Sequence, residues 1–117
     1  MNANTTKSTF ENTGLNESVV LKINKVFAGF ENIKEVHIFG SRVKNTFKAG
    51  SDIDLVIMHS DVNPKELISI ESKLEALLLP YKIDLCVYEK LENIKLIEHI
   101  DRLSRLFYDQ VAYAKNS

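Results

Sequence analysis

The chain has 117 residues, of which 44% are hydrophobic and 26% charged, and its formal net charge is −1. These values are typical of a one-domain soluble globular protein, and the near-neutral charge argues against a long nucleic acid as partner. No apolar run approaches the roughly 20 residues of a membrane span, so we expect no membrane contact. The single cysteine, Cys86, excludes an intramolecular disulfide and favours a cytoplasmic location.

The first part of the chain, residues 1–15, is polar and shows no periodicity. We expect a flexible N-terminal arm there, followed by a single domain over residues 16–117. A helix comes next, because apolar residues recur at helical spacing from Val19 to Phe30. Asn16 is a suitable N-cap and Gly29 a suitable exit. We expect this helix to cover one face of a β-sheet.

A strand–loop–strand unit follows and carries the most informative residues. Its first strand runs from Val36 to Phe39, and its second strand opens with Asp52 and Asp54. Because side chains alternate between the two faces of a strand, both carboxylates point the same way. Neighbouring carboxylates repel each other unless a cation lies between them, and hard oxygen ligands suit Mg²⁺. The second strand therefore predicts a metal-binding pair.

The break between these strands adds a phosphate-binding feature. Gly40 has no Cβ to obstruct a ligand, and Ser41 offers a hydroxyl and a backbone N–H suited to a phosphate nest. Taken separately, Gly-Ser is a common turn and Asp-x-Asp can be an exposed strand end. Their combination across ten residues favours phosphoryl or nucleotidyl transfer, which depends on positioning and charge neutralisation.

The loop between the Gly-Ser pair and the two aspartates is basic. Arg42 directly follows Ser41, so we expect it to pair with a triphosphate or with a carboxylate of the site. For Phe47, contact with the core or with a partner is favoured over capping of a base. The second strand continues as an apolar run to Met58, which indicates a central position in the sheet.

The next helix has clear boundaries. Asn63 as N-cap and Pro64 in the first turn predict its start, and Pro80 predicts its end. Its apolar stripe is expected to extend to Leu78. The following strand, residues 81–88, contains Asp84 among apolar residues, where a carboxylate is costly to bury without a cation or a hydrogen-bond donor. Asp84 is therefore the natural third partner of the aspartate pair.

A final helix is expected from about Leu91 to Tyr108, with its apolar residues at helical spacing. The aromatic residues near its end are expected to pack in the core, with contact to a helical partner as the alternative. The three histidines lie far apart in the sequence without ligand spacing, so each is interpreted as structural or exposed. Cys86 has no neighbouring histidine and is interpreted as a small core residue.

The motif described above resembles a known family. Gly40-Ser41, ten residues, then Asp52-Ile53-Asp54 is similar to the signature of the DNA polymerase β-type nucleotidyltransferase superfamily. The surrounding sequence resembles its minimal, single-domain prokaryotic members, the minimal nucleotidyltransferase (MNT) proteins, over roughly residues 19–107. The resemblance implies an α/β fold, a small mixed β-sheet of three or more strands with helices packed on one face. The Mg²⁺ and the nucleotide would lie on the other face.

The resemblance also implies a set of site residues. Asp84 matches the third carboxylate of the family, whereas Asn45 stands where many relatives carry glycine; asparagine tolerates the left-handed backbone better than most residues. The implied catalytic and metal-binding residues are Asp52, Asp54 and Asp84, and the nucleotide-binding residues are Gly40, Ser41 and Arg42. Two Mg²⁺ ions would act as cofactors and ATP would be the substrate.

The acceptor follows from the resemblance alone. MNT proteins of the best-understood type are antitoxins that transfer AMP from ATP to a tyrosine of a helical HEPN ribonuclease toxin, which would be the partner here. Two alternatives stay open. One is nucleotidyl transfer to a small molecule such as an aminoglycoside, and the other is a non-catalytic antitoxin that acts by occlusion.

Overall fold

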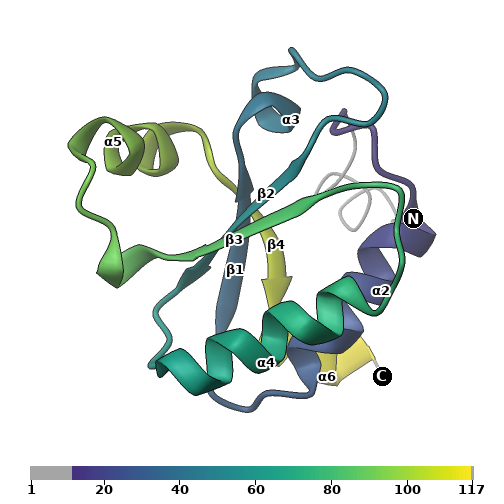
Figure 1. Ribbon diagram of the computed structural model, residues 1–117, viewed down its shortest axis with the longest axis vertical. Helices are drawn as coiled ribbons and strands as arrows, with labels where there is room; N and C mark the ends of the chain where they lie inside the picture. The colour runs from purple at the N-terminus through teal and green to yellow at the C-terminus, as the bar shows by residue number, and fades with distance from the viewer. Residues whose placement is uncertain (1–11, 117) are drawn as a thin grey trace.

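The computed structural model describes residues 12–116 and shows a four-stranded mixed β-sheet in the order β3-β2-β1-β4 (Figure 1). The strands are β1 (Glu35–Phe39), β2 (Ile53–Met58), β3 (Ile83–Val87) and β4 (Arg105–Asp109). Strand β1 is antiparallel to both β2 and β4, and β2 is parallel to β3. The α/β class and the mixed sheet predicted from the sequence are confirmed, as is the central position of β2.

The helical segments are α2 (Glu17–Ala28), α3 (Ser41–Lys44), α4 (Pro64–Glu75), the 3₁₀ helix η1 (Tyr88–Lys90), α5 (Ile94–Leu103) and α6 (Gln110–Asn116). The predicted caps are present, because Asn16 Oδ1 accepts from the Val19 amide at 2.9 Å and Asn63 Oδ1 accepts from the Glu66 amide at 2.8 Å. Within residues 12–116, no helix combines the length and apolar character needed to cross a membrane.

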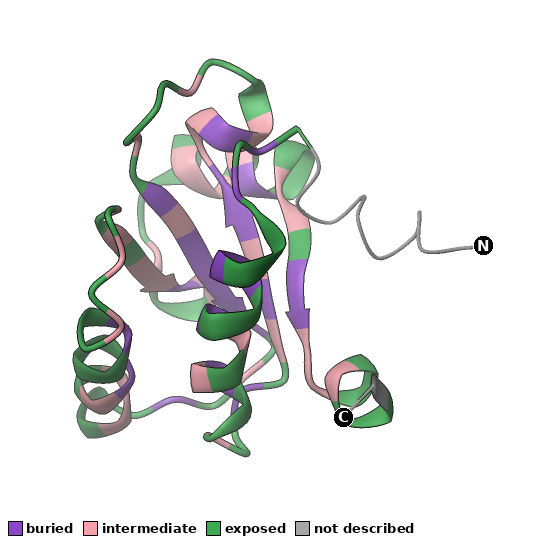
Figure 2. Ribbon diagram, turned by 90° about the vertical axis from the view of Figure 1, so that its right-hand side faces the viewer, coloured by how far each residue is buried: buried purple, intermediate pink, exposed green. Residues whose placement is uncertain are grey.

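The main core lies between the sheet and helices α2 and α4, which contact each other. Alternate residues of the central strands face these helices; among them, Ile38 and Leu55 are fully buried, as is Phe27 of α2. Each such side chain stabilises the fold by about 1.5–3 kcal/mol. Figure 2 shows buried residues concentrated on the strands, with the helices exposed on their outer sides. The core therefore makes the sheet a rigid support for residues at its ends.

The second face of the sheet is partly covered by α5. Ile100 of this helix packs with Phe39, Val56 and Met58, and Figure 1 shows α5 on the opposite side of the sheet from α2 and α4. The sequence analysis placed helices on one face only. The difference arises because a shorter α5 folds back over the sheet, so it reaches the end of β1 next to Gly40.

The C-terminal part differs from the long helix predicted to Tyr108. Helix α5 ends at Leu103, Ser104 takes an extended conformation, and the chain continues as β4 and then α6. Strand β4 hydrogen-bonds along β1, an edge that a continued helix would leave unpaired. The expectation that the aromatic residues there are buried still holds, since Phe107 and Tyr108 lie in the core.

Two further boundaries differ from the prediction. Helix α4 ends at Glu75, before Pro80, and Leu78 adopts a left-handed conformation with φ of 54° and is 88% exposed, so it does not belong to the buried stripe. In the predicted flexible arm, Thr13 and Leu15 are buried, so its last residues, 12–15, pack against the domain. The rest of the arm lies outside the described residues.

Candidate active site

The Gly40–Ser41 turn lies directly against a carboxylate. Gly40 ends β1 with φ of 82° and ψ of −151°, a conformation that side-chain-bearing residues rarely adopt. A Cβ at this position would overlap Oδ2 of Asp54. Ser41 directly follows Gly40 and is the first residue of α3. Glycine is therefore needed here for both backbone geometry and close approach.

Asp54 and Asp84 are neighbours on one face of the sheet, because parallel strands β2 and β3 pair them in register. The pKa of the Asp54 carboxyl is raised, first by burial and then by the negative charges of Asp84 and Asp52. A side-chain hydrogen bond with Asp84 raises this pKa further, while the positive charge of Arg42 opposes the shift. The three carboxylates predicted from the sequence thus influence each other electrostatically.

Asp52 has a different setting from the other two aspartates. It lies immediately before β2 and is exposed, and its backbone carbonyl accepts a hydrogen bond from Arg42 Nε at 3.3 Å. The loop, rather than the strand, therefore positions Asp52. Asp84 is also accessible and forms an ion pair with Lys82, whose Nζ lies 3.7 Å from Asp84 Oδ1, and both side chains face solvent.

The carboxylates fit a Mg²⁺ ion that binds together with a phosphate ligand. Among residues 12–116, no three histidine, cysteine, aspartate or glutamate side chains are already arranged around a metal position. Mg²⁺ does not require such a cage, because it keeps several waters and binds through one or two carboxylates plus substrate phosphates. A cation would offset both the burial and the negative charges that raise the pKa of Asp54, so the donor set matches this ion.

The neighbouring thiol has a raised pKa. Cys86 follows Asp84 on the same face of β3, and burial together with the charges of Asp54 and Asp84 raises its pKa to about 11. A thiol with this pKa stays protonated at neutral pH and is a poor nucleophile. The interpretation of Cys86 as a small packing residue agrees with this environment.

Arg42, which the sequence predicts to bind the nucleotide, lies buried beside the site and turned away from solvent. Its side chain is only 2% exposed, and its guanidinium donates to three backbone carbonyls: to Thr13 and Ser51 at 2.7 Å each, and to Asp52. The guanidinium carbon also lies 5.2 Å from the ring centroid of Phe47 and 5.0 Å from that of Tyr81. We call these residues the Arg42 cluster. Since α3 turns by about 100° per residue, Ser41 and Arg42 point in different directions.

Asn45 adopts a left-handed backbone conformation, which glycine also adopts easily. It ends α3 with φ of 64° and ψ of 29°, the left-handed region, and its amide donates to the Ser41 carbonyl. Asparagine tolerates this region better than most residues. The departure from the family pattern is therefore compatible with the turn that holds Ser41.

His99 is a neighbour of the site that sequence reasoning missed. The Gly40 amide donates to His99 Nε2 at 3.1 Å, across 59 residues of sequence. The packing of α5 on the sheet creates this contact, so no local motif signals it. Beside β3 there is also a cavity of about 870 Å³, within the range of small-molecule pockets. Residues that line its part near the site are Phe39, Lys82, Asp84, Cys86 and Leu96.

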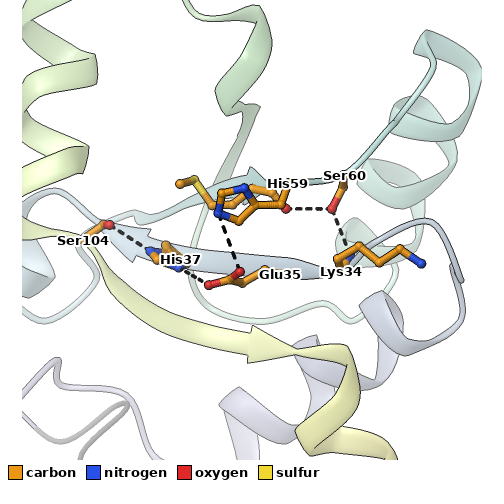
Figure 3. A network of polar contacts seen from close by, with 7 residues as sticks. Lys34, Glu35, His37, His59, Ser60 and Ser104 are labelled. Carbon is orange, nitrogen blue, oxygen red and sulfur yellow. Dashed lines mark hydrogen bonds and ion pairs between the residues drawn. The ribbon is translucent and has the colours of Figure 1, made fainter.

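The other two histidines meet at a separate place. Figure 3 shows the Glu35 carboxylate between His37 and His59, with Nε2–oxygen distances of 2.8 and 3.9 Å. His37 Nδ1 also hydrogen-bonds Ser104 Oγ at 2.9 Å. Glu35 lies at the opposite end of β1 from the Gly40 turn. This network therefore links β1, the residue between α5 and β4, and the loop after β2, and it does not contribute to the site.

Comparisons with known proteins concern the family and the fold. The family model described as polymerase beta, nucleotidyltransferase, matches residues 21–112. No curated protein matches the sequence. Solved structures share the fold at low sequence identity.

A chain of a toxin–antitoxin complex with AMP-PNP is 21% identical, with a TM-score of 0.59 over 81% of this chain and 74% of that chain. A chain of the toxin–antitoxin complex MntA-HepT is 17% identical, with a TM-score of 0.60 over 80% and 73%. A chain of the tri-AMPylated Shewanella oneidensis HEPN toxin in complex with MNT antitoxin is 16% identical, with a TM-score of 0.59 over 85% and 76%. These likenesses show a shared fold.

Proposed function

Because this chain belongs to the polymerase beta nucleotidyltransferase family, we propose that it is a Mg²⁺-dependent enzyme that transfers AMP from ATP to a protein hydroxyl. The acceptor in this proposal is a tyrosine of a HEPN toxin, which the transfer silences. One observation carries the proposal: the Gly40–Ser41 turn adjoins Asp54, which is paired in register with Asp84. A phosphate-binding turn beside paired carboxylates is the arrangement that nucleotidyl transfer needs.

In the proposed reaction, the turn binds the β- and γ-phosphates through the Ser41 hydroxyl and the amides at the start of α3. Asp52, Asp54 and Asp84 would hold Mg²⁺, which supplies charge neutralisation of the triphosphate and of the leaving pyrophosphate. Asp84, the more exposed carboxylate of the pair in register, takes the proton of the acceptor hydroxyl. The acceptor oxygen forms a bond to the α-phosphorus as the bond to pyrophosphate breaks.

The choice of acceptor is supported by the kind of complexes that share the fold. They include toxin–antitoxin complexes, one with AMP-PNP and one with a tri-AMPylated HEPN toxin. The accessible position of Asp84 at an edge strand is compatible with an acceptor as large as a protein side chain. We therefore favour a protein acceptor over a small molecule.

Intact-mass spectrometry of a cognate HEPN toxin tests the proposal, after incubation with this protein, ATP and Mg²⁺. We expect mass increments of one or more AMP units, which should be absent when the double variant Asp52→Asn/Asp54→Asn replaces the wild type. An unchanged toxin mass despite a stable complex would overturn catalysis in favour of occlusion. No modification and no complex would instead favour small-molecule acceptors.

A further inference from the structure

His99 holds the backbone of the glycine that begins the phosphate-binding turn. A backbone N–H can only donate a hydrogen bond, so the contact of the Gly40 amide with His99 Nε2 requires that nitrogen to be unprotonated. The imidazole packs edge-on against Phe39, with 6.0 Å between the ring centroids. Burial, followed by the positive charges of Lys44 and Arg102, lowers the pKa of His99. The environment thus favours the neutral form that accepts this bond.

The sheet topology explains why a side chain is needed at this point. The pairing of β1 with β4 extends to Ile38 and Arg105, where β4 begins, and so it does not reach Gly40. A partly buried amide that lacks a strand partner destabilises the fold unless another group accepts its hydrogen bond. His99, from the helix that precedes β4, supplies that acceptor.

Gly40 is held through its amide by His99 and through its carbonyl by α3. Its carbonyl accepts from the amides of Val43 and Lys44 at 3.2 and 3.1 Å, and its Cα lies against the Asp54 carboxylate. Glycine is the most conformationally free residue, so a glycine turn is only preorganised if its neighbours restrict it. Without His99, the peptide group between Phe39 and Gly40 would lose its fixed orientation.

We propose that His99 is a positioning residue, which fixes the Gly40 amide so that Ser41 and the start of α3 meet the triphosphate without prior ordering. This inference rests on the proposed function, because the nucleotide is the ligand that benefits. His99 itself need not touch the nucleotide. Its effect is on the affinity of the turn for phosphates, since preorganisation reduces the ordering cost of binding.

The test uses two substitutions with opposite expectations. His99→Leu keeps an apolar contact for Phe39 but removes the acceptor, whereas His99→Gln keeps an acceptor oxygen at a position similar to Nε2. We expect His99→Leu to weaken binding of Mg²⁺ with a non-hydrolysable ATP analogue about tenfold and to raise hydrogen exchange of the Gly40 amide by a similar factor. In His99→Gln, both the analogue affinity and the slow exchange of the Gly40 amide should be close to those of the wild type. The matched control is His59→Asn, at an exposed histidine outside the site, because asparagine tolerates the left-handed backbone of that position. It should change neither the analogue affinity nor the exchange of the Gly40 amide.

The two readouts separate the possible failures. Unchanged Gly40 exchange in His99→Leu would overturn the inference, because the amide would then not depend on His99. Faster exchange with unchanged analogue affinity would also overturn it, since fixation would then have no effect on the nucleotide. If wild-type protein bound no analogue at all, the proposed function would fail together with the inference, a result distinguishable from the other two.

Discussion

Ser41 and Arg42 are consecutive in the sequence but belong to two regions with opposite electrostatics. On one side, Asp54 and Asp84 face each other, and burial together with the negative charges of Asp84 and Asp52 raises the pKa of Asp54. On the other side, the Arg42 cluster buries a cation whose guanidinium donates to three carbonyls and stacks between two rings. The two regions show that a charged side chain can serve either the fold or a ligand. A charge satisfied within the fold supports the structure, whereas charges that repel each other indicate a ligand.

The two regions are also mechanically connected. Arg42 donates to the carbonyls of Ser51 and Asp52, at the end of the loop that begins with its own helix. It therefore ties both ends of the loop together and determines where Asp52 enters the site. Four substitutions distinguish the acidic site from the buried residues that support it.

Gly40→Ala should damage the acidic site most. The added Cβ overlaps the Asp54 carboxylate, and the positive φ of Gly40 adds backbone strain. A displacement of about 1 Å at reacting groups costs roughly a hundredfold in rate, so we expect at least that loss in AMP transfer, measured by the mass-spectrometric assay. Gly50→Ala is the matched control, since Gly50 also has positive φ but open space around it. Equal losses of AMP transfer in the two variants would show that backbone strain alone causes the effect.

Arg42→Met should damage the fold rather than the chemistry. Loss of the guanidinium leaves the carbonyls of Thr13, Ser51 and Asp52 without this donor in a region where the side chain is buried. We expect a decrease of about 3 kcal/mol in the free energy of unfolding, measured by urea denaturation. A variant with wild-type stability but no binding of ATP analogue would contradict this assignment and return Arg42 to the nucleotide site.

Asn45→Val tests the turn that connects the two regions. A β-branched residue in the left-handed conformation costs roughly 1–2 kcal/mol, and we expect a loss of that size in the free energy of unfolding. Asn45→Gly should be neutral or slightly stabilising, because glycine adopts this conformation without strain. A stable Asn45→Val variant would show that the turn does not need φ of 64°.

Asp54→Asn should slightly stabilise the metal-free protein at neutral pH. Because the pKa of Asp54 is raised in the folded state, the folded protein binds this proton more tightly than the unfolded chain, so stability falls as pH rises above the usual carboxyl pKa. The variant avoids this loss of stability. The gain in the free energy of unfolding should stay below about 1 kcal/mol, because Asp54 is partly solvated. Thermal unfolding should show the gain at pH 7 but not near pH 3. A variant less stable than the wild type at pH 7 would contradict the unfavourable environment of the ionised Asp54 carboxylate.

The features predicted from the sequence are those encoded locally. The caps at Asn16 and Asn63, the strand that ends at Gly40, and the apolar context of Asp84 each depend on residues close in the chain. The juxtaposition of Asp54 and Asp84 needed one further fact, that β2 and β3 are parallel and in register.

The features that were missed depend on contacts between distant segments. Strand β4 forms because β1 offers a free edge, a condition that the helical spacing of the last segment does not reveal. The placement of Arg42 depends on carbonyls of Thr13 and Ser51, and that of His99 on where α5 packs. Adjacency to Ser41 suggested phosphate binding for Arg42, but the helical turn directs it inward.

Asp54 and Asp84 are paired so that they can hold a cation together with a nucleotide. Isothermal titration calorimetry with a non-hydrolysable ATP analogue, in Mg²⁺ and then in EDTA, measures this directly. We expect binding that requires Mg²⁺ and is lost in the double variant Asp54→Asn/Asp84→Asn, which should remain folded. Binding that persists in EDTA, or that survives in the double variant, would contradict it.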